Sequence, residues 1–378
     1  MRPKNGRLVM VVAVVAVAAV AIGGVLAYRQ GPRTGGETAA PLTADSVSGP
    51  ASTSVLPPTS AAPYSGPAYV TLKLSKLPTG RPPQIPYMVG REVRGGAGTP
   101  VKLPGSQVVL EIARLGEEVL AVVETVGGGS SELLKVSSAV EVERVPGVVN
   151  VVTTEDETAA AYSVQSTVKG ALVAGGAIYA QSAGGKVQKL SLSKVWQPLV
   201  LSYANGKIFF RAGSGPDAAA WSLYSWTPGA AEATQVKDIQ SPTALSPDTK
   251  LVGSRAVAAE YGACSTVDEF ASGKQLWRTC DRGIDGFTPD GTVALAGPPY
   301  AEGYAPTVAT ALDARTGNLL REWSGASFVE AFVEDDQHLL IIADDGPETR
   351  RGIIRCTLPT GSCELAVPLT TERLELGQ

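Results

Sequence analysis

The sequence predicts an all-β protein built from a repeated four-stranded unit, and three observations support this prediction. Five glycines recur at a spacing of 44 residues: Gly185, Gly229, Gly273, Gly317 and Gly361. At four of them an apolar, β-branched or aromatic run ends and another begins, as expected of strands joined by a tight turn. A second set of turn motifs recurs at nearly the same period: Asn205-Gly206, Ser246-Pro-Asp248, Thr288-Pro-Asp290-Gly291 and Glu334-Asp-Asp336. A period of this length is typical of a β-propeller.

The marked glycines predict the turns between the third and fourth strands of each blade. This register places six blades near residues 107–146, 147–194, 195–238, 239–281, 282–325 and 326–370. Upstream, residues 85–90 and 99–104 predict two further strands, and residues 69–74 a third. We expect these strands to form a seventh blade closed by residues 370–376, because such pairing removes free strand edges.

Seven blades is therefore the prediction, and six or eight are the alternatives. The second blade carries the ambiguity. Residues 165–183 contain Gly170, Gly175 and Gly176, and fit either one strand or a whole hairpin. An extra hairpin there would raise the count to eight.

An almost wholly apolar stretch, residues 8–28, precedes the repeats. About 20 such residues cross a hydrocarbon core as a helix, so we predict one transmembrane helix. Basic side chains precede this stretch, which places residues 1–7 in the cytoplasm and everything after residue 28 outside the cell membrane. A signal peptide cleaved near residues 25–27 is the alternative, although the stretch exceeds the usual apolar region of such peptides. Both interpretations export the repeats.

The segment between helix and repeats has the composition of a disordered tether. Residues 29–63 contain 26 Pro, Gly, Ser, Thr or Ala among 35 positions. Such a coil spans on the order of 30 to 35 Å. Residues 64–378 then form one extracytoplasmic propeller with 27 basic against 34 acidic residues, a net charge of −7. That charge argues against nucleic acid or anionic lipid as the main partner.

The four cysteines support the same register. Cys264 and Cys280 lie symmetrically about one marked turn, and Cys356 and Cys363 about another. Directly opposed residues of antiparallel strands lie within disulfide range, so we predict Cys264–Cys280 and Cys356–Cys363. Disulfides persist in an exported, oxidising compartment. Zinc is disfavoured because no C-x-x-C spacing exists and His338 is the single histidine.

No catalytic residue, metal site or cofactor is predicted. Any Ser-His-Asp set would centre on His338, which we interpret as a strand residue beside a turn. The acidic clusters, at residues 155–157, 334–336 and 344–348, lack the D-x-D-x-D spacing of a calcium loop and are predicted to be solvated turns. Most of the five tryptophans are predicted to pack between blades.

Loops joining second and third strands open on the face opposite the marked turns, and they carry the candidate binding residues. The longest, residues 297–306, contains Tyr300 and Tyr304, and its neighbours carry Tyr261 and the pair Arg350-Arg351. Tyrosine and arginine gathered on one rim are typical of interaction hot spots. The alternative is that these prolines, glycines and tyrosines only form long turns that cap the blades.

The Ser-Pro-Asp and Thr-Pro-Asp-Gly turns and the turn at residues 313–317 resemble those of WD-repeat, TolB-like and quinoprotein-like propellers, over about residues 80–370. The chain departs from WD repeats in lacking their Gly-His and Trp-Asp pairs. The resemblance implies protein binding more often than catalysis. The high Ala, Val and Gly content and the long tether are similar to those of exported actinobacterial proteins.

These observations predict a non-catalytic, membrane-tethered extracytoplasmic propeller that binds a protein partner or scaffolds an assembly in the cell envelope. A propeller enzyme or quinone-dependent oxidoreductase is the first alternative. Binding of cell-wall carbohydrate is the second.

Overall fold

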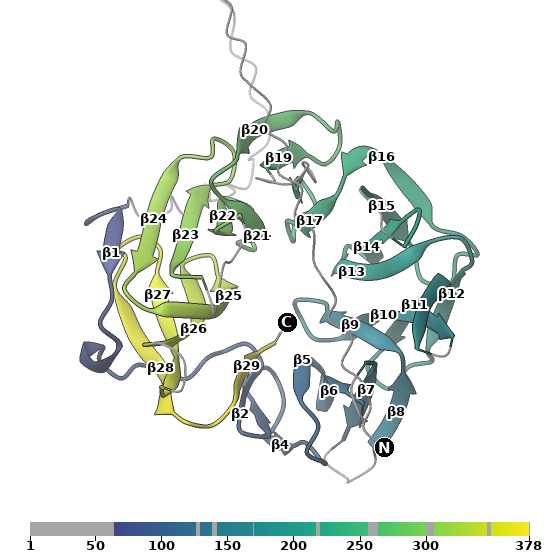
Figure 1. The fold of residues 1–378 in the computed structure, drawn as a ribbon, viewed down its shortest axis with the longest axis horizontal. Helices are drawn as coiled ribbons and strands as arrows, with labels where there is room; N and C mark the ends of the chain where they lie inside the picture. Colours follow the sequence, from purple (N-terminus) through teal and green to yellow (C-terminus); the bar gives the residue numbers. More distant parts are fainter. Residues whose placement is uncertain are drawn as a thin grey trace, which may run out of the picture. The chain divides into compact units, whose positions relative to one another are not determined.

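The computed structural model describes residues 64–125, 129–137, 142–168, 170–216, 220–255, 264–299, 306–345 and 349–377. These residues form seven sheets arranged around a central axis (Figure 1), which confirms the predicted seven-bladed propeller. The predicted transmembrane helix and tether, residues 8–28 and 29–63, lie outside the described residues. Within the described residues, no helix is long and apolar enough to span a bilayer.

Six blades use four consecutive strands each, numbered from the channel outward (Figure 1). Blade 1 comprises β5 (Val109–Leu115), β6 (Glu118–Glu124), β7 (Ser131–Val136) and β8 (Val142–Pro146). Blade 2 comprises β9 (Val148–Thr153), β10 (Ala159–Val168), β11 (Ala171–Ser182) and β12 (Gln188–Leu192). Blade 3 comprises β13 (Trp196–Ala204), β14 (Lys207–Gly213), β15 (Trp221–Trp226) and β16 (Thr234–Gln240).

The next three blades repeat the pattern. Blade 4 comprises β17 (Pro242–Leu245), β18 (Leu251–Arg255), β19 (Ser265–Glu269) and β20 (Gln275–Thr279). Blade 5 comprises β21 (Gly283–Phe287), β22 (Val293–Gly297), β23 (Val308–Asp313) and β24 (Leu319–Ser324). Blade 6 comprises β25 (Ser327–Asp335), β26 (His338–Asp344), β27 (Arg351–Thr357) and β28 (Cys363–Thr370). All six predicted blade boundaries are confirmed to within three residues.

Blade 7 joins the two ends of the described chain. Its innermost strand is β29 (Leu374–Leu376), followed outward by β2 (Tyr87–Val89), β3 (Glu92–Arg94) and β4 (Val101–Lys102). Closure by the C-terminal strand is therefore confirmed. The third N-terminal strand of this blade was predicted at residues 69–74, and that prediction is wrong. The strand is β3, which the tight turn at Gly90 (φ 64°) connects directly to β2.

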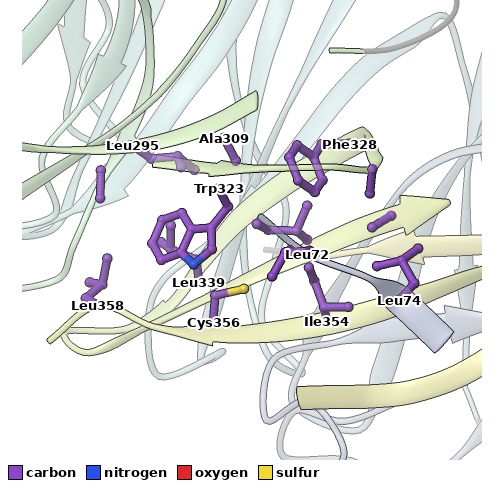
Figure 2. Close-up of a cluster of buried hydrophobic side chains, with 14 of the residues drawn as sticks. Leu72, Leu74, Leu295, Ala309, Trp323, Phe328, Leu339, Ile354, Cys356 and Leu358 are labelled. Atoms are coloured by element: carbon purple, nitrogen blue, oxygen red, sulfur yellow. The ribbon is translucent and has the colours of Figure 1, made fainter. Parts of the chain in front are cut away.

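The strand predicted at residues 69–74 belongs to another blade. β1 (Tyr69–Thr71) pairs in parallel with β24 and adds a fifth, outermost strand to blade 5. Leu74–Lys76 then form a 3₁₀ turn. The reason is apolar burial: Leu72 and Leu74 pack with Trp323 of β24 and Ile354 of β27 in one core cluster (Figure 2).

Residues 64–84, which we call the strap, cover the outer edges of two blades. Glu322 N donates to Ala68 O at 2.7 Å along β24, and Gly80 N donates to Leu365 O at 2.9 Å along β28. An edge covered in this way cannot pair with another chain. The open outer strand β8 carries Glu143 and Arg144, and charged residues on an open edge discourage such pairing.

The second blade contains one long hairpin and no extra one, so the eight-bladed alternative is wrong, as is the six-bladed one. β10 and β11 pair from Ala159–Ser182 to Val168–Ala171, with an irregular register near Gln165. Gly175 and Gly176 lie at this irregularity with φ of 109° and 154°. A Cβ on Gly176 would lie 2.3 Å from Val164 O, so only glycine fits this position.

The marked turns and both disulfides are confirmed. All five 44-residue marks fall between third and fourth strands, although at the first of them the residue with positive φ is Gly184. Cys264–Cys280 and Cys356–Cys363 join neighbouring third and fourth strands, with Cα–Cα distances of 4.0 and 4.1 Å.

In the second set of turns, the Asp290 carboxylate accepts hydrogen bonds from Thr288 Oγ1 at 2.7 Å and from Thr292 N at 3.0 Å. Such side-chain bonds stabilise the turn locally.

Six of the seven inner strands carry a single-residue β-bulge at an equivalent place. The extra residues are Leu110, Val149, Leu201, Thr243, Asp285 and Val329. A bulge increases local twist and changes the direction of neighbouring side chains. These six inner strands can therefore present polar groups both to the channel and to the adjacent blade.

Leu74→Ala tests the role of the strap. The side chain is buried beside Trp323, so its truncation is expected to lower the free energy of unfolding by about 2 to 5 kcal/mol. The matched control is Lys73→Ala, an exposed neighbour expected to change stability by less than ~0.5 kcal/mol. Urea denaturation measures both, and equal losses would show that the strap is not part of the core.

Candidate functional site

A central channel is the principal cavity found among the described residues. It has a volume of about 1320 Å³ and is lined by the inner strands of all seven blades. The turns between first and second strands line one end, including Glu155 and Asn205, and Glu334 near the end of β25 also lines it. The channel is thus a product of ring closure rather than of any one blade.

The described lining residues carry charge of one sign. Seven are acidic and none is lysine or arginine. The acidic ones are Glu111, Glu155, Asp156, Glu157, Asp285, Glu330 and Glu334. A cleft lined by one sign of charge within low-dielectric walls focuses the electrostatic field and attracts the opposite charge.

The β-bulges place three of these carboxyls in the channel wall. Asp285 is itself the extra residue of β21, while Glu111 and Glu330 directly follow the extra residues of β5 and β25. In a regular strand, side chains alternate strictly between the two faces. A bulge breaks that alternation, which allows an acidic residue to lie beside buried apolar neighbours.

Each of these carboxyls is held by a backbone N–H group. Glu111 Oε2 accepts a hydrogen bond from Val151 N of blade 2 at 2.9 Å. Glu330 accepts from Leu376 N of blade 7, and Asp285 accepts from Gly297 N of its own blade. Two of the three therefore also connect adjacent blades.

Burial raises the pKa of every one of them. The pKa of Glu111 rises to about 7 and that of Glu330 to about 8. The pKa of Glu375, on β29, rises to about 7 for the same reason, although Arg373 opposes the shift. Asp285 is 53% exposed, but to the channel, so burial still raises its pKa to about 6 against the effect of Arg255 at 4.0 Å. These groups are therefore partly protonated near neutral pH, where a bound cation would favour their ionised forms.

Blades 2 to 4 use neutral side chains at equivalent places. Asn150 accepts from Val200 N at 3.1 Å and donates to Val200 O at 2.7 Å, which connects blade 2 to blade 3. Thr243 Oγ1 donates to Ile284 O at 2.8 Å, which connects blade 4 to blade 5. The carboxyls that the bulges place in the channel wall, Asp285, Glu330 and Glu111, therefore belong to blades 5, 6 and 1.

The predicted acidic turns divide into two kinds. Glu155 and Asp156 are exposed, as predicted. Glu334 and Asp344 are fully buried, at 0% side-chain exposure, so their assignment to solvated turns is wrong. The Glu334 carboxylate forms an ion pair with the buried Arg355 guanidinium, with Nη2–Oε1 at 2.7 Å. This ion pair compensates the cost of burying the carboxylate charge.

Glu334, Asp335 and His338 bring potential metal ligands within 4.8 Å of one another. Arg355 and the backbone N–H of Gln84 already occupy the Glu334 carboxylate, and His338 Nδ1 lies 2.8 Å from Asp335 Oδ1. A metal would have to displace a buried guanidinium. The cluster instead anchors the strap, because Arg355 also donates hydrogen bonds to Arg81 O and Pro82 O.

His338 is the first residue of β26, which confirms its interpretation as a strand residue beside a turn.

Two tryptophans pack between blades as predicted. Trp277 Nε1 donates to Ala314 O of blade 5 at 2.9 Å, and Trp323 Nε1 donates to Gly361 O of blade 6 at 3.0 Å. Their ring nitrogens thereby connect consecutive blades.

The predicted rim is only partly described. Tyr261, Tyr300 and Tyr304 lie outside the described residues. Arg350 is exposed directly before β27, and Arg351, the first residue of β27, lies 3.9 Å from the buried Asp344. The described ends of β18, β22 and β26, at Arg255, Gly297 and Asp344, lie at the end of their blades opposite the marked turns, as the alternating strand directions require. Binding by the rim stays a prediction.

The sequence analysis did not select Glu111, Glu330 or Glu375. One signal marks them: each is a lone acidic residue within an apolar strand, as in Leu110-Glu111-Ile112, Val329-Glu330-Ala331 and Leu374-Glu375-Leu376. An acidic residue at such a position needs a special environment, because an unpaired buried charge is costly.

No protein-family model matches the sequence, and no curated protein matches it. Several solved structures are similar to this chain in fold. The β-propeller domain of the Trilobed protease from Pyrococcus furiosus is 9% identical, with a TM-score of 0.48, over 70% of this chain and 86% of that one. TolB from Acinetobacter baumannii is 14% identical, with a TM-score of 0.46, over 70% and 66%. Prolyl oligopeptidase B from Galerina marginata is 10% identical, with a TM-score of 0.48, over 70% and 43%. The resemblance concerns the propeller fold.

Arg355→Met tests the buried ion pair. It leaves the Glu334 carboxylate buried without its cation, so the free energy of unfolding is expected to fall by about 3 to 5 kcal/mol. The matched control is Arg94→Met, which breaks a more exposed pair with Glu92 and is expected to cost less than about 1 kcal/mol. If added zinc or calcium restored the thermal stability of Arg355→Met, the cluster would be a metal site after all.

Proposed function

We propose that this chain is a non-catalytic, membrane-tethered extracytoplasmic propeller that binds a protein partner in the cell envelope. The acidic channel receives a basic segment of that partner. The observation that carries this proposal is the one-sign lining: seven acidic and no basic side chains among the described lining residues.

Charge complementarity selects a basic partner. Residues 64–378 carry a net charge of −7, so the field of the whole domain adds to that of the channel. Complementary potentials accelerate encounter and exclude acidic competitors. A fixed array of carboxyls is thus more selective for lysine and arginine than for a neutral segment.

The size and polarity of the channel suit a chain segment. Its volume of about 1320 Å³ exceeds that of ordinary small-molecule pockets, which measure roughly 300 to 1,000 Å³. Val329 is exposed in its wall, and Tyr203 and Phe332 also line it. Lysine and arginine pack their long alkyl stems on such surfaces while their charged ends reach carboxylates.

Two features support the tethered, exported location. All four cysteines are paired, which suits an oxidising compartment. The strap that follows the predicted tether is firmly anchored, since Arg321 Nη2 donates to Ser65 O and Pro359 O. A tether attached there holds the domain near the membrane without placing mechanical force on the channel. The rim loops with Tyr261, Tyr300, Tyr304, Arg350 and Arg351 extend the proposed contact at the other end.

Photo-crosslinking in cells tests this function. A photoreactive residue at Asn205, on a turn that lines the channel, is expected to capture a partner through a lysine- or arginine-rich peptide. The matched control is Gln188, which is exposed on outer strand β12. Asp285→Asn with Glu330→Gln is expected to lower the yield about tenfold or more, because each charge-assisted contact is worth about 1.5 to 3 kcal/mol.

Three outcomes contradict the proposal. They are equal capture from Gln188, capture through an acidic segment, and an unchanged yield in the double variant. Retention of the purified domain on cell-wall glycan would support carbohydrate binding instead, and a co-purifying quinone would support an oxidoreductase. A partner captured equally from Tyr300→Ala/Tyr304→Ala and from wild type would remove the rim from the site.

A further inference from the structure

Three carboxyls from three successive inner strands converge on the closing strand. Glu330 comes from β25 of blade 6, Glu375 from β29 of blade 7, and Glu111 from β5 of blade 1. Glu375 is buried, with 8% of its surface exposed. Glu330 touches the strand directly, because its carboxyl accepts the N–H of Leu376.

β29 is held by few backbone hydrogen bonds, although its buried Leu374 and Leu376 pack with Leu340 and Ile342 of blade 6. Its three residues pair with β2, with Tyr87 opposite Leu376 and Val89 opposite Leu374. Beyond the strand, Gly377 N donates to Pro86 O at 2.8 Å and Gly377 forms a bridge to Ile112. A strand this short contributes few backbone hydrogen bonds, so the charges around it strongly affect its attachment.

The cations near this cluster do not balance it. Arg373 lies 3.3 Å from Glu375 Oε2, but it is 45% exposed and also donates to Val109 O at 2.6 Å. Arg351 lowers the pKa of Glu375, yet it also faces the buried Asp344 at 3.9 Å. On β2, the residue opposite Glu375 is the uncharged Met88. If all three carboxyls were ionised, only two guanidinium groups would oppose their charge. The Arg373 group is partly solvated, and the Arg351 group is shared with Asp344.

Protonation relieves this imbalance. Burial raises the pKa of Glu375 from an ordinary value of 4.5 to about 7. Burial and the charge of Glu375 raise the pKa of Glu111 to about 7, and burial with the charges of Glu375 and Glu111 raises that of Glu330 to about 8. The folded state therefore binds more protons than the unfolded chain in this range. The stabilisation is complete below pH ~4.5 and is lost as the pH rises through 7 and 8.

We propose that β29 is a proton-controlled latch on the ring. When Glu111, Glu330 and Glu375 share protons, the strand is bound between blades 6 and 1. When all three ionise, their repulsion releases β29 from β2 and opens the channel wall. This latch is a property of ring closure and does not depend on the proposed partner.

Hydrogen exchange of the full chain, read by mass spectrometry at about pH 5.5 and pH 8.5, tests the latch. After correction for intrinsic exchange, protection of the β29 amides is expected to fall at least about tenfold at the higher pH, the factor that one unit of pKa shift represents. Blade 3, which has no carboxyl in this cluster, is expected to keep its protection. Glu330→Gln is expected to reduce the pH dependence, and Glu111→Gln serves if that variant does not fold.

The matched control is Asp268→Asn in blade 4. Burial also raises the pKa of Asp268, but the residue lies on β19, away from the closing strand, so the wild-type pH dependence of β29 is expected to persist. The latch is refuted if β29 protection does not change with pH or if Glu330→Gln and Asp268→Asn have equal effects. Loss of protection in all blades together would refute it too, because that result means global unfolding.

Discussion

The pairing of β29 with β2 is the constraint on which the ring depends. Only three residues pair, yet they connect segments almost 300 residues apart in the chain. Closing a loop of that length costs about 5 kcal/mol in chain entropy, and the local contacts must exceed this cost. The strap adds a second connection on the outside, since it contacts β24 and β28 before the chain enters blade 7. The ring is therefore closed twice, once at the channel and once at the periphery.

Closure also creates the channel and its chemistry. Equivalent bulges allow each inner strand to place a polar side chain against the next blade, and the type of side chain varies around the ring. Asn150 and Thr243 satisfy this requirement without charge. Glu111 and Glu330 satisfy it with carboxyls, at the cost of an unfavourable ionised state. A neutral residue could accept the same N–H bonds, so these carboxyls indicate a function beyond structure, which the proposed basic partner would provide.

Local features of the fold could be predicted from the sequence, and those that depend on distant residues could not. The turns at Gly229 and Gly317 and the Cys356–Cys363 pair follow from short segments with a fixed period. The parallel pairing of β1 with β24 joins residues about 250 positions apart, and no local pattern indicates which blade edge the strap covers. Glu111 escaped selection and Glu334 was assigned to a solvated turn, because their burial depends on a bulge and on Arg355, and neither has a sequence signature.

Removing the closing strand tests this account most directly. In a chain that ends at Thr370, the account predicts a loss of unfolding free energy on the order of 5 kcal/mol, because the buried Leu374 and Leu376 are lost together with their backbone pairing. Urea denaturation followed by tryptophan fluorescence would show this loss in blades 3, 4 and 5, which carry the tryptophans and lie away from β29. A truncated chain that unfolds at the same urea concentration as the full chain would contradict the claim that β29 closes the ring.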